Sequence, residues 1–380
     1  MSATGRGPST GARAPSRGAV QRRGRSSLDC AFAFLLVGAS ASSCGQTVVL
    51  EDQIADGSSS RDGSSSDGSS SDASCSGNPP PLFFTQEIPE IVIALDRSSA
   101  MNDPFGGDPS QLYSALNALR AEVLHFGAQT SNGQPIIRFA LLDFPDTAPY
   151  CNAALNCCSS DVTPIASDSA FLAAAPPVCN PPNDCSQAPQ RPTAYALSKA
   201  QTFLEIEQPT GPRYVLLVTD GPPSGCSTPP KDPCGDAITQ VGLLSNSGIK
   251  TIIVSIGDGS NTSCLLDLAN VEGAQGAPFF YPASSPSDLT TALSTIVGTA
   301  AQGACRLDLT TMPLGPDQIS VKFNTDTVQR DNNNGWSLGG NGGSRVTLNG
   351  AACQKLIQDG TFGLTVSDGC SGGHFGGQTP

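Results

Sequence analysis

The chain has 380 residues, a formal net charge of −13 and only 14% charged residues. Its 41 Gly and 31 Pro predict a loop-rich protein, with enough apolar residues for one large domain or two smaller ones. Nucleic-acid binding depends on clustered Lys and Arg, so this acidic balance argues against nucleic acid as a partner.

Residues 1–43 have the pattern of an export signal. Six Arg precede an apolar run at residues 31–38, which is far shorter than the ~20 residues of a membrane span. Small residues then lead directly to Cys44, and this arrangement resembles a bacterial lipobox with Ala41 in place of the usual Leu. The resemblance implies that Cys44 carries a lipid anchor. We expect an exported protein anchored at the outer envelope, the periplasm or the cell surface, with plain secretion as the alternative.

The cysteine count agrees with an oxidising compartment. The chain has 14 Cys, and removing Cys30 of the signal and the lipid-bearing Cys44 leaves 14 − 2 = 12, which predicts up to six disulfides. Metal-binding thiols are the alternative, but they favour Cys-x-x-Cys pairs, and the sequence has none.

A low-complexity segment follows the predicted anchor. Residues 44–85 are rich in Ser, Gly and Asp and have no apolar periodicity, so we expect a flexible linker. Such a linker serves as a tether that holds the folded part away from a membrane.

Between residues 86 and 303, short apolar strands alternate with helical runs. Residues 90–96 are apolar almost throughout, as expected for a strand buried on both faces, and residues 110–129 form a helix with Ser110 as its N-cap. A Cys-rich insertion at 149–190 interrupts the pattern. The remaining predicted elements are strand 135–144, helix 192–208, strand 213–219, helix 232–247, strand 250–257, helix 264–271, strand 277–281 and helix 287–301. This alternation predicts an α/β fold, a doubly wound and mostly parallel sheet with helices on both faces.

The sequence pattern changes after Cys305. We expect residues 304–371 to form a small β-rich appendage with strands near 319–323, 343–348 and 362–366. Some of Cys305, Cys353 and Cys370 should staple it, and Trp336 should fill its core. The Gly-rich residues 372–380 are expected to be a disordered tail.

Three polar clusters come next to predicted strand ends or a helix start. Asp96 and Ser98 follow the first strand, Thr193 opens a helix, and Asp220 follows the strand 213–219. In an open α/β sheet, ligands bind at the carboxyl ends of the strands. The sequence therefore predicts that these side chains meet at one edge of the sheet.

Together the three clusters resemble the metal-ion-dependent adhesion site of von Willebrand factor A domains. That site combines Asp-x-Ser-x-Ser after the first strand, a Thr on a second loop and an Asp-Gly after the fourth strand. The resemblance covers residues 86–303 and implies a site for Mg²⁺ (or Mn²⁺ or Ca²⁺). Ser98 and Thr193 would supply hydroxyl ligands, and Asp96 and Asp220 would hold negative charge nearby.

The resemblance also implies a type of partner. An ion with few direct carboxylates attracts an acidic oxygen, so we expect a protein or cell-surface ligand that offers one. Ala100 stands where the family pattern has its second Ser, and a methyl group cannot be a ligand. This departure predicts a weakened metal site.

Other chemistry has little support in the sequence. His125 lies in a predicted helix and His374 in the Gly-rich tail, so we expect neither a His-based catalytic triad nor a zinc site. Segments 257–259 and 331–335 lack the P-loop lysine and the EF-hand spacing, respectively, and are expected to be turns. We therefore expect a non-enzymatic binding module. The alternative is a structural, disulfide-braced envelope lipoprotein with a degenerate metal site.

Overall fold

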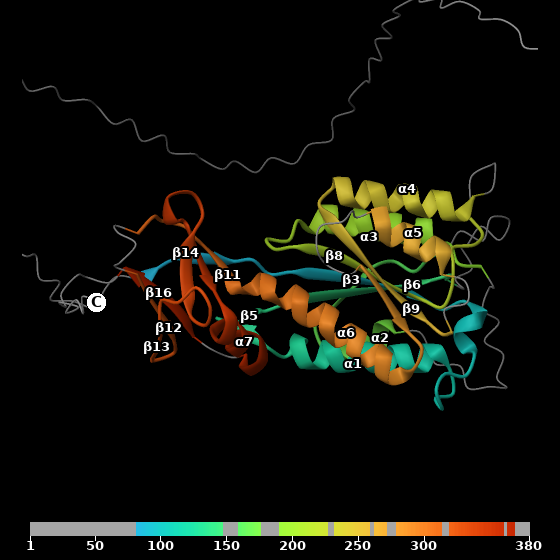
Figure 1. Cartoon of the computed structure of the whole chain (residues 1–380), viewed down its shortest axis with the longest axis horizontal. Helices are drawn as coiled ribbons and strands as arrows, with labels where there is room; N and C mark the ends of the chain where they lie inside the picture. Colours follow the sequence, from blue (N-terminus) through green and yellow to red (C-terminus); the bar gives the residue numbers. More distant parts are fainter. Residues whose placement is uncertain are drawn as a thin grey trace, which may run out of the picture. The chain divides into compact units, whose positions relative to one another are not determined.

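The computed structural model describes residues 81–146, 159–175, 190–226, 232–258, 262–271, 279–313, 319–360 and 363–368. The predicted export signal, Cys44, His374 and the tail lie outside these residues. Among the described helices, none has the length and apolar character needed to cross a membrane. The described part contains a six-stranded sheet with helices on both faces, followed by two four-stranded sheets (Figure 1).

The six-stranded sheet has the order β10-β9-β8-β3-β6-β7. All neighbours pair in parallel except the edge strand β7, which is antiparallel to β6. Counted in chain order, this is the 3-2-1-4-5-6 arrangement of doubly wound sheets, with the winding reversed between β3 and β8. The strands are β3 (Glu90–Asp96), β6 (Arg138–Phe144), β7 (Thr163–Ile165), β8 (Arg213–Thr219), β9 (Ile249–Ile256) and β10 (Phe280–Ala283).

Side chains of β3 alternate between two hydrophobic cores. Ile91, Ile93 and Leu95 belong to one core, and Val92 and Ala94 belong to the other. Full burial of each such aliphatic side chain contributes roughly 1.5–3 kcal/mol, which explains the continuous apolar sequence of this central strand. The first core is covered by α1 (Gln111–Gly127), α2 (Asp168–Ala174) and α6 (Pro286–Ala301), and the second by α3 (Thr193–Glu207), α4 (Pro233–Asn246) and α5 (Ser263–Val271) (Figure 1).

Side-chain caps fix where several helices begin. Ser110 accepts a hydrogen bond from the backbone N–H of Tyr113 at 3.1 Å, which confirms the predicted cap of α1. Asp232 caps α4 in the same way through the N–H of Gly235.

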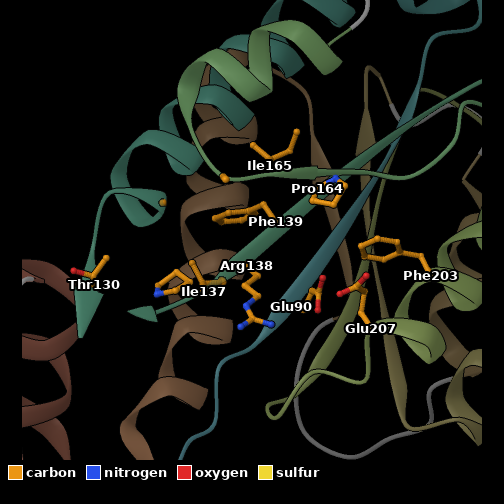
Figure 2. Close-up of a pocket in the computed structure, with 12 residues that line it drawn as sticks. Glu90, Thr130, Ile137, Arg138, Phe139, Pro164, Ile165, Phe203 and Glu207 are labelled. Carbon is orange, nitrogen blue, oxygen red and sulfur yellow. The ribbon is translucent and has the colours of Figure 1, made fainter. Parts of the chain in front are cut away.

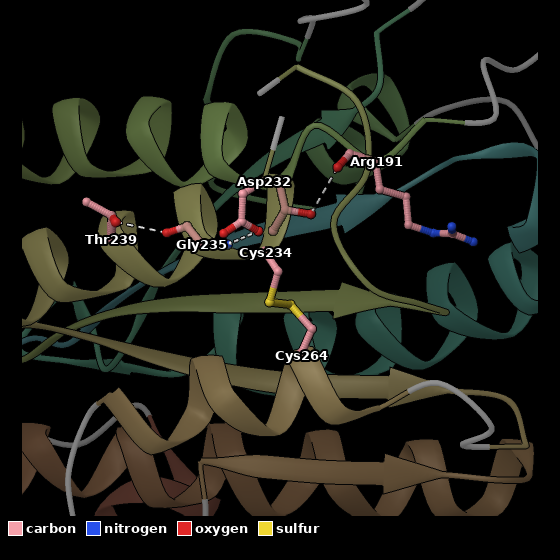
Figure 3. The surroundings of a disulfide bond; sticks show 7 residues. Arg191, Asp232, Cys234, Gly235, Thr239 and Cys264 are labelled. Carbon is pink, nitrogen blue, oxygen red and sulfur yellow. Dashed lines mark hydrogen bonds between the residues drawn. A yellow bond between two sulfur atoms is a disulfide. The ribbon is translucent and has the colours of Figure 1, made fainter. Parts of the chain in front are cut away.

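A disulfide ties two helices together on one face of the main sheet. Cys234 of α4 bonds to Cys264 of α5, as Figure 3 shows. The Asp232 cap lies beside this bond, whereas the side chain of Arg191 points away from it (Figure 3). The loop after β8 is also fixed by a disulfide at Cys226.

The chain beyond α6, together with β1 and β2 from before the main sheet, forms two antiparallel sheets with orders β1-β16-β12-β13 and β14-β15-β11-β2. The predicted disulfide staple is confirmed as Cys305–Cys353, which joins η2 (Gln302–Cys305) to α7 (Gly350–Asp359). Cys370 lies outside the described residues. The strands are β1 (Pro81–Leu82), β2 (Phe84–Gln86), β11 (Arg306–Leu309), β12 (Ile319–Phe323), β13 (Asp326–Val328), β14 (Trp336–Gly339), β15 (Arg345–Leu348) and β16 (Leu364–Asp368).

The C-terminal sheets share one hydrophobic core with the α1 and α6 face of the main sheet. Trp336 is 3% exposed within this core, as expected from the sequence. The hairpin of β4 (Thr130–Ser131) and β5 (Gln134–Pro135) reinforces the contact, because Asn132 in its turn exchanges two hydrogen bonds of 3.0 Å with the backbone of Leu364. The appendage is therefore packed firmly on the α/β part.

The structure departs from or adds to the sequence-based expectations in three places. The linker was expected to extend to residue 85, but residues 81–82 and 84–86 form β1 and β2, which pair with β16 and β11. The Cys-rich insertion contains two regular elements, the edge strand β7 and the helix α2, which are too short for a sequence pattern to reveal. The predicted strand 135–144 is interrupted, because β5 ends at Pro135 and belongs to a separate hairpin with β4.

Candidate metal centre

The predicted site residues lie where the winding of the main sheet reverses. Asp96 is the last residue of β3, and Asp220 directly follows β8, its parallel neighbour. Doubly wound sheets bind their ligands at such a reversal, outside the carboxyl ends of the strands. The topology therefore brings together two carboxylates that are far apart in the sequence.

Asp96 is completely buried and takes part in three hydrogen bonds. Its Oδ1 atom accepts from the backbone N–H of Ser98 at 2.7 Å. Its Oδ2 atom accepts from the hydroxyl of Thr219 at 2.6 Å and from Nε of Arg191 at 3.1 Å. The carboxylate is thus held by the loop that follows it, by the neighbouring strand and by a distant loop.

Arg191 links the two carboxylates. Its Nε atom, which reaches Asp96, also lies 2.8 Å from Oδ1 of Asp220, and its Nη2 atom lies 2.7 Å from the same oxygen. The Arg191 side chain is 15% exposed and that of Asp220 is 6% exposed, so solvent screens these ion pairs little. The guanidinium therefore occupies the position of a shared counter-ion.

Backbone contacts hold Arg191 in place. The N–H of Arg191 donates to the carbonyl of Ser224 at 3.0 Å, and the N–H of Ser224 donates to the carbonyl of Arg191 at 2.9 Å. Gly221 leaves the space the guanidinium needs, because a Cβ atom there would lie 3.2 Å from Cζ of Arg191. The loop before α3 and the loop after β8 thus form one unit.

Ser98 is fully buried, and its hydroxyl has no hydrogen-bond partner among the described residues. It is the N-cap residue of the short helix η1 (Ser99–Asn102), but its side chain makes no capping hydrogen bond. Ser99, the next hydroxyl in the chain, is exposed. Burying an unpaired hydroxyl costs free energy of folding. The hydroxyl of Ser98 is therefore a candidate ligand for a cation.

Thr193 is the first residue of α3 and is 1% exposed. Its hydroxyl donates weakly, at 3.3 Å, to the carbonyl of Arg191. Thr193 is therefore tied to the same loop as the guanidinium, but no direct hydrogen bond joins it to Asp96 or Asp220 in the described structure.

The site is short of positive charge. Burial, together with the charge of the neighbouring Asp220, raises the pKa of Asp96 to about 6, against the lowering effects of Arg191, Thr219 and Ser98. Two carboxylates and one guanidinium leave a formal charge of about −1 in a poorly hydrated place. Such a place attracts a further cation.

A second buried ion pair supports the same edge of the sheet. Arg97, directly after Asp96, pairs with Asp143 near the end of β6, and both side chains are largely buried. The backbone N–H of Arg97 also donates to the carbonyl of Phe144 at 2.7 Å. These contacts fix the loop that presents Ser98.

The oxygen donors fit a hard divalent cation in kind, since two carboxylates and two buried hydroxyls come from three loops at the carboxyl ends of the strands. Within the described residues there is no group of three or more His, Cys, Asp or Glu suited to a metal. A cation here would therefore depend on the hydroxyl oxygens, as the resemblance implies.

The sequence predicted which residues line this edge, but it missed the side chains that connect them. Arg191 and Thr219 were not predicted as part of the site. One signal was available in the sequence: Arg191 is a lone positively charged residue two positions before Thr193 in an acidic protein.

Ala100 is half-buried within η1, one position after the exposed Ser99.

Comparisons with known proteins show likeness in structure only. No protein-family model matches the chain, and no curated protein matches it. Among solved structures, proximal thread matrix protein 1 from the mussel byssus is 18% identical with a TM-score of 0.38, over 58% of this chain and 48% of that chain. The open form of the pilus adhesin SpaC from Lactobacillus rhamnosus GG is 13% identical with a TM-score of 0.45, over 75% of this chain and 38% of that chain.

The VWA domain of SpRpn10 is 15% identical with a TM-score of 0.37, over 56% of this chain and 95% of that domain. The chain thus spans less than half the length of the mussel and pilus proteins. TM-scores below 0.5 give these likenesses little weight. The strand order, the two helical layers and the polar residues at the reversal between β3 and β8 identify the doubly wound fold.

Proposed function

We propose that the chain is a binding module that captures an acidic group of a protein or cell-surface ligand through a divalent cation. The supporting observation is the pair of buried carboxylates, Asp96 and Asp220, which share one guanidinium beside the unpaired hydroxyl of Ser98. Mg²⁺, Mn²⁺ and Ca²⁺ all favour such oxygen donors. The resemblance to von Willebrand factor A domains points in the same direction.

In this proposal each residue has a distinct role. Ser98 and Thr193 provide hydroxyl oxygens, while Asp96 and Asp220 hold the negative charge. A bound divalent cation supplies an open coordination position for an acidic oxygen of the partner. Ala100 provides no oxygen, so the affinity for the cation is lower than a Ser at this position would give.

Arg191 controls access to the carboxylates. A cation that pairs with Asp96 and Asp220 competes with a guanidinium that already contacts both. The side chain of Arg191 therefore moves away from at least one carboxylate when a cation binds. In the absence of a cation, Arg191 keeps the two buried negative charges from destabilising the fold.

We also propose that the module is displayed on the outside of a bacterial cell through a lipid on Cys44. Disulfides at Cys234–Cys264 and Cys305–Cys353 support folding in an oxidising compartment. Binding is proposed rather than catalysis. His125, the one described histidine, is exposed on α1 and packs edge-on against Phe126, away from the candidate centre.

A second candidate is a structural envelope protein in which Arg191 is the permanent counter-ion. The two-sided contact of Arg191 with Asp96 and Asp220 favours this role, because a satisfied ion triad needs no metal. The disulfides and the shared core would then be the features that stabilise it.

Metal titration and partner capture separate the two candidates. The full chain is titrated with Mg²⁺ by calorimetry, and it is then used to capture surface proteins with Mg²⁺ or with EDTA. The binding module requires Mg²⁺ uptake and capture that EDTA abolishes, both lost in Asp220→Asn and kept in the exposed control Asp326→Asn. Capture that persists in EDTA and in Asp220→Asn supports the structural role.

A further inference from the structure

A cavity of about 460 Å³ lies at the end of the main sheet opposite the candidate metal centre, where the parallel strands begin (Figure 2). The end of α1, the β4–β5 hairpin, β6, β7 and α3 form its walls. Its size falls within the usual range for sites that bind small molecules, about 300–1,000 Å³. Its apolar lining consists of Pro135, Ile137, Phe139, Pro164, Ile165 and Phe203.

A buried carboxylate faces this cavity. Glu90 is the first residue of β3 and is only 4% exposed. Its Oε2 atom is inaccessible to water and has no hydrogen-bond partner among the described residues. A carboxylate oxygen in this condition lacks the donors that normally offset the cost of its burial.

Two other charged side chains line the cavity, Arg138 and Glu207. Figure 2 shows the carboxylates of Glu90 and Glu207 facing each other, with the guanidinium of Arg138 on the other side of Glu90. Arg138 pairs with Glu90 in strand register, yet within the described part of the chain it forms no ion pair with either carboxylate. Two carboxylates and one guanidinium leave an excess of negative charge beside an apolar wall.

We propose that this cavity binds small molecules that combine an apolar body with a protonated amine. The ammonium pairs with the carboxylate of Glu90 and balances the excess charge that Glu207 contributes. The apolar body packs against Phe139, Ile165 and Phe203. A ligand with a carboxylate is disfavoured because it would add a third negative charge.

This site is separate from the candidate metal centre. Glu90 and Asp96 are the two ends of β3, and six residue steps of ~3.3 Å place them roughly 20 Å apart. Amine binding therefore does not depend on the cation proposed for the other edge. Its test gives the same result whether or not Mg²⁺ is present.

Three alkyl probes with the same chain length test the proposal: hexylamine, hexanol and hexanoate. Calorimetry on the full-length protein gives the affinities, and amide NMR shifts at Gly127, Thr130 and Ala166 locate the bound probe. Hexylamine is expected to bind at least tenfold more tightly than the other two probes. Glu90→Gln is expected to remove at least tenfold of the hexylamine affinity.

Glu122→Gln is the matched control, because Glu122 is also a buried carboxylate but does not line the cavity. It should leave hexylamine binding unchanged. If Glu90→Gln does not fold, Glu207→Gln on the exposed side takes its place, and a several-fold loss is expected. Equal binding of all three probes, no binding of hexylamine, or full binding by the glutamine variants overturns the proposal.

Discussion

The Nε atom of Arg191 lies 3.1 Å from Oδ2 of Asp96, a residue 95 positions earlier in the chain. The same guanidinium reaches Asp220, so one side chain neutralises part of the charge of two buried carboxylates. In a protein with far more acidic than basic residues, this arrangement makes Arg191 both a stabilising group and a competitor for any metal ion.

Replacing Arg191 should separate these two effects. Arg191→Gln leaves Asp96 and Asp220 without their counter-ion, which should lower the free energy of unfolding by roughly 3–5 kcal/mol without metal. It should also tighten Mg²⁺ binding about tenfold, equivalent to ~1.4 kcal/mol, because the competing cation is gone. Calorimetry and thermal unfolding with and without Mg²⁺ measure both effects. Arg120→Gln, which breaks the more exposed pair with Asp168, is the control. Lower Mg²⁺ affinity in Arg191→Gln contradicts the competition.

Ser98→Ala should remove metal binding without harming the fold. The buried Ser98 hydroxyl makes no hydrogen bond in the described structure, so its loss should leave the unfolding free energy unchanged or raise it by about 1 kcal/mol. Mg²⁺ binding should fall below detection by calorimetry. A variant that still binds Mg²⁺ as well as the wild type would show that this hydroxyl is not a ligand.

Ala100→Ser should have the opposite effect on the metal. The new hydroxyl restores the oxygen that the family pattern has at this position, and Mg²⁺ binding should become several-fold tighter. Parallel calorimetric titrations of both forms provide the measurement. If neither responds to Mg²⁺, Mn²⁺ or Ca²⁺, the site has only a structural role.

Glu90 should make stability depend on pH. Burial raises its pKa above the ordinary 4.5, Glu207 adds to this effect, and Arg138 opposes it. Arg213 of β8 lies opposite Glu90 in the sheet, but its guanidinium donates a hydrogen bond to the carbonyl of Ser247 instead of pairing with Glu90. A raised carboxylate pKa means that the folded state holds its proton longer, so stability falls as pH rises from about 4.5 to the raised value.

The variant Glu90→Gln removes this loss. It should unfold at a higher temperature than the wild type at pH 8, and the difference should disappear near pH 4, where Glu90 is protonated in both states. Thermal unfolding followed by circular dichroism across this range tests the sign. A variant that is less stable at pH 8 would mean that the Glu90 charge is compensated in the folded protein.

The disulfide Cys305–Cys353 should be a major source of stability. It closes a 48-residue separation, and the entropy of the unfolded loop predicts a contribution of about 4 kcal/mol. The double variant Cys305→Ala/Cys353→Ala should therefore show a lower urea midpoint under oxidising conditions. Cys234→Ala/Cys264→Ala, with a separation of 30, should lose a similar amount. An unchanged midpoint would show that the shared core alone holds α7 in place.

The main sheet could be predicted from the sequence because its central strands are buried on both faces. The strand β3 and its neighbour β8 appear as uninterrupted apolar runs, and both lie at their predicted positions. The C-terminal part was harder. The strands β11 and β14 have four residues each and are only partly apolar, and α7 follows a Gly-rich region, so no pattern distinguished them from turns.

The candidate site could be predicted in its residue types but not in its connections. Asp96 and Asp220 follow apolar strands, and parallel strands place such residues at one edge. The position of Arg191 depends on the backbone pairing with Ser224, which forms only when two distant loops meet. The local sequence around each loop therefore does not predict this pairing.

The pairing of β1 with β16 and of β2 with β11 determines how the folded part responds to mechanical load. A pull on the N-terminal side of the chain acts first on these two short antiparallel pairings. Only after they separate does tension reach β3, the strand that ends at Asp96 and is held between two parallel neighbours. The C-terminal sheets thus take up such a pull before it reaches the strand that carries Asp96.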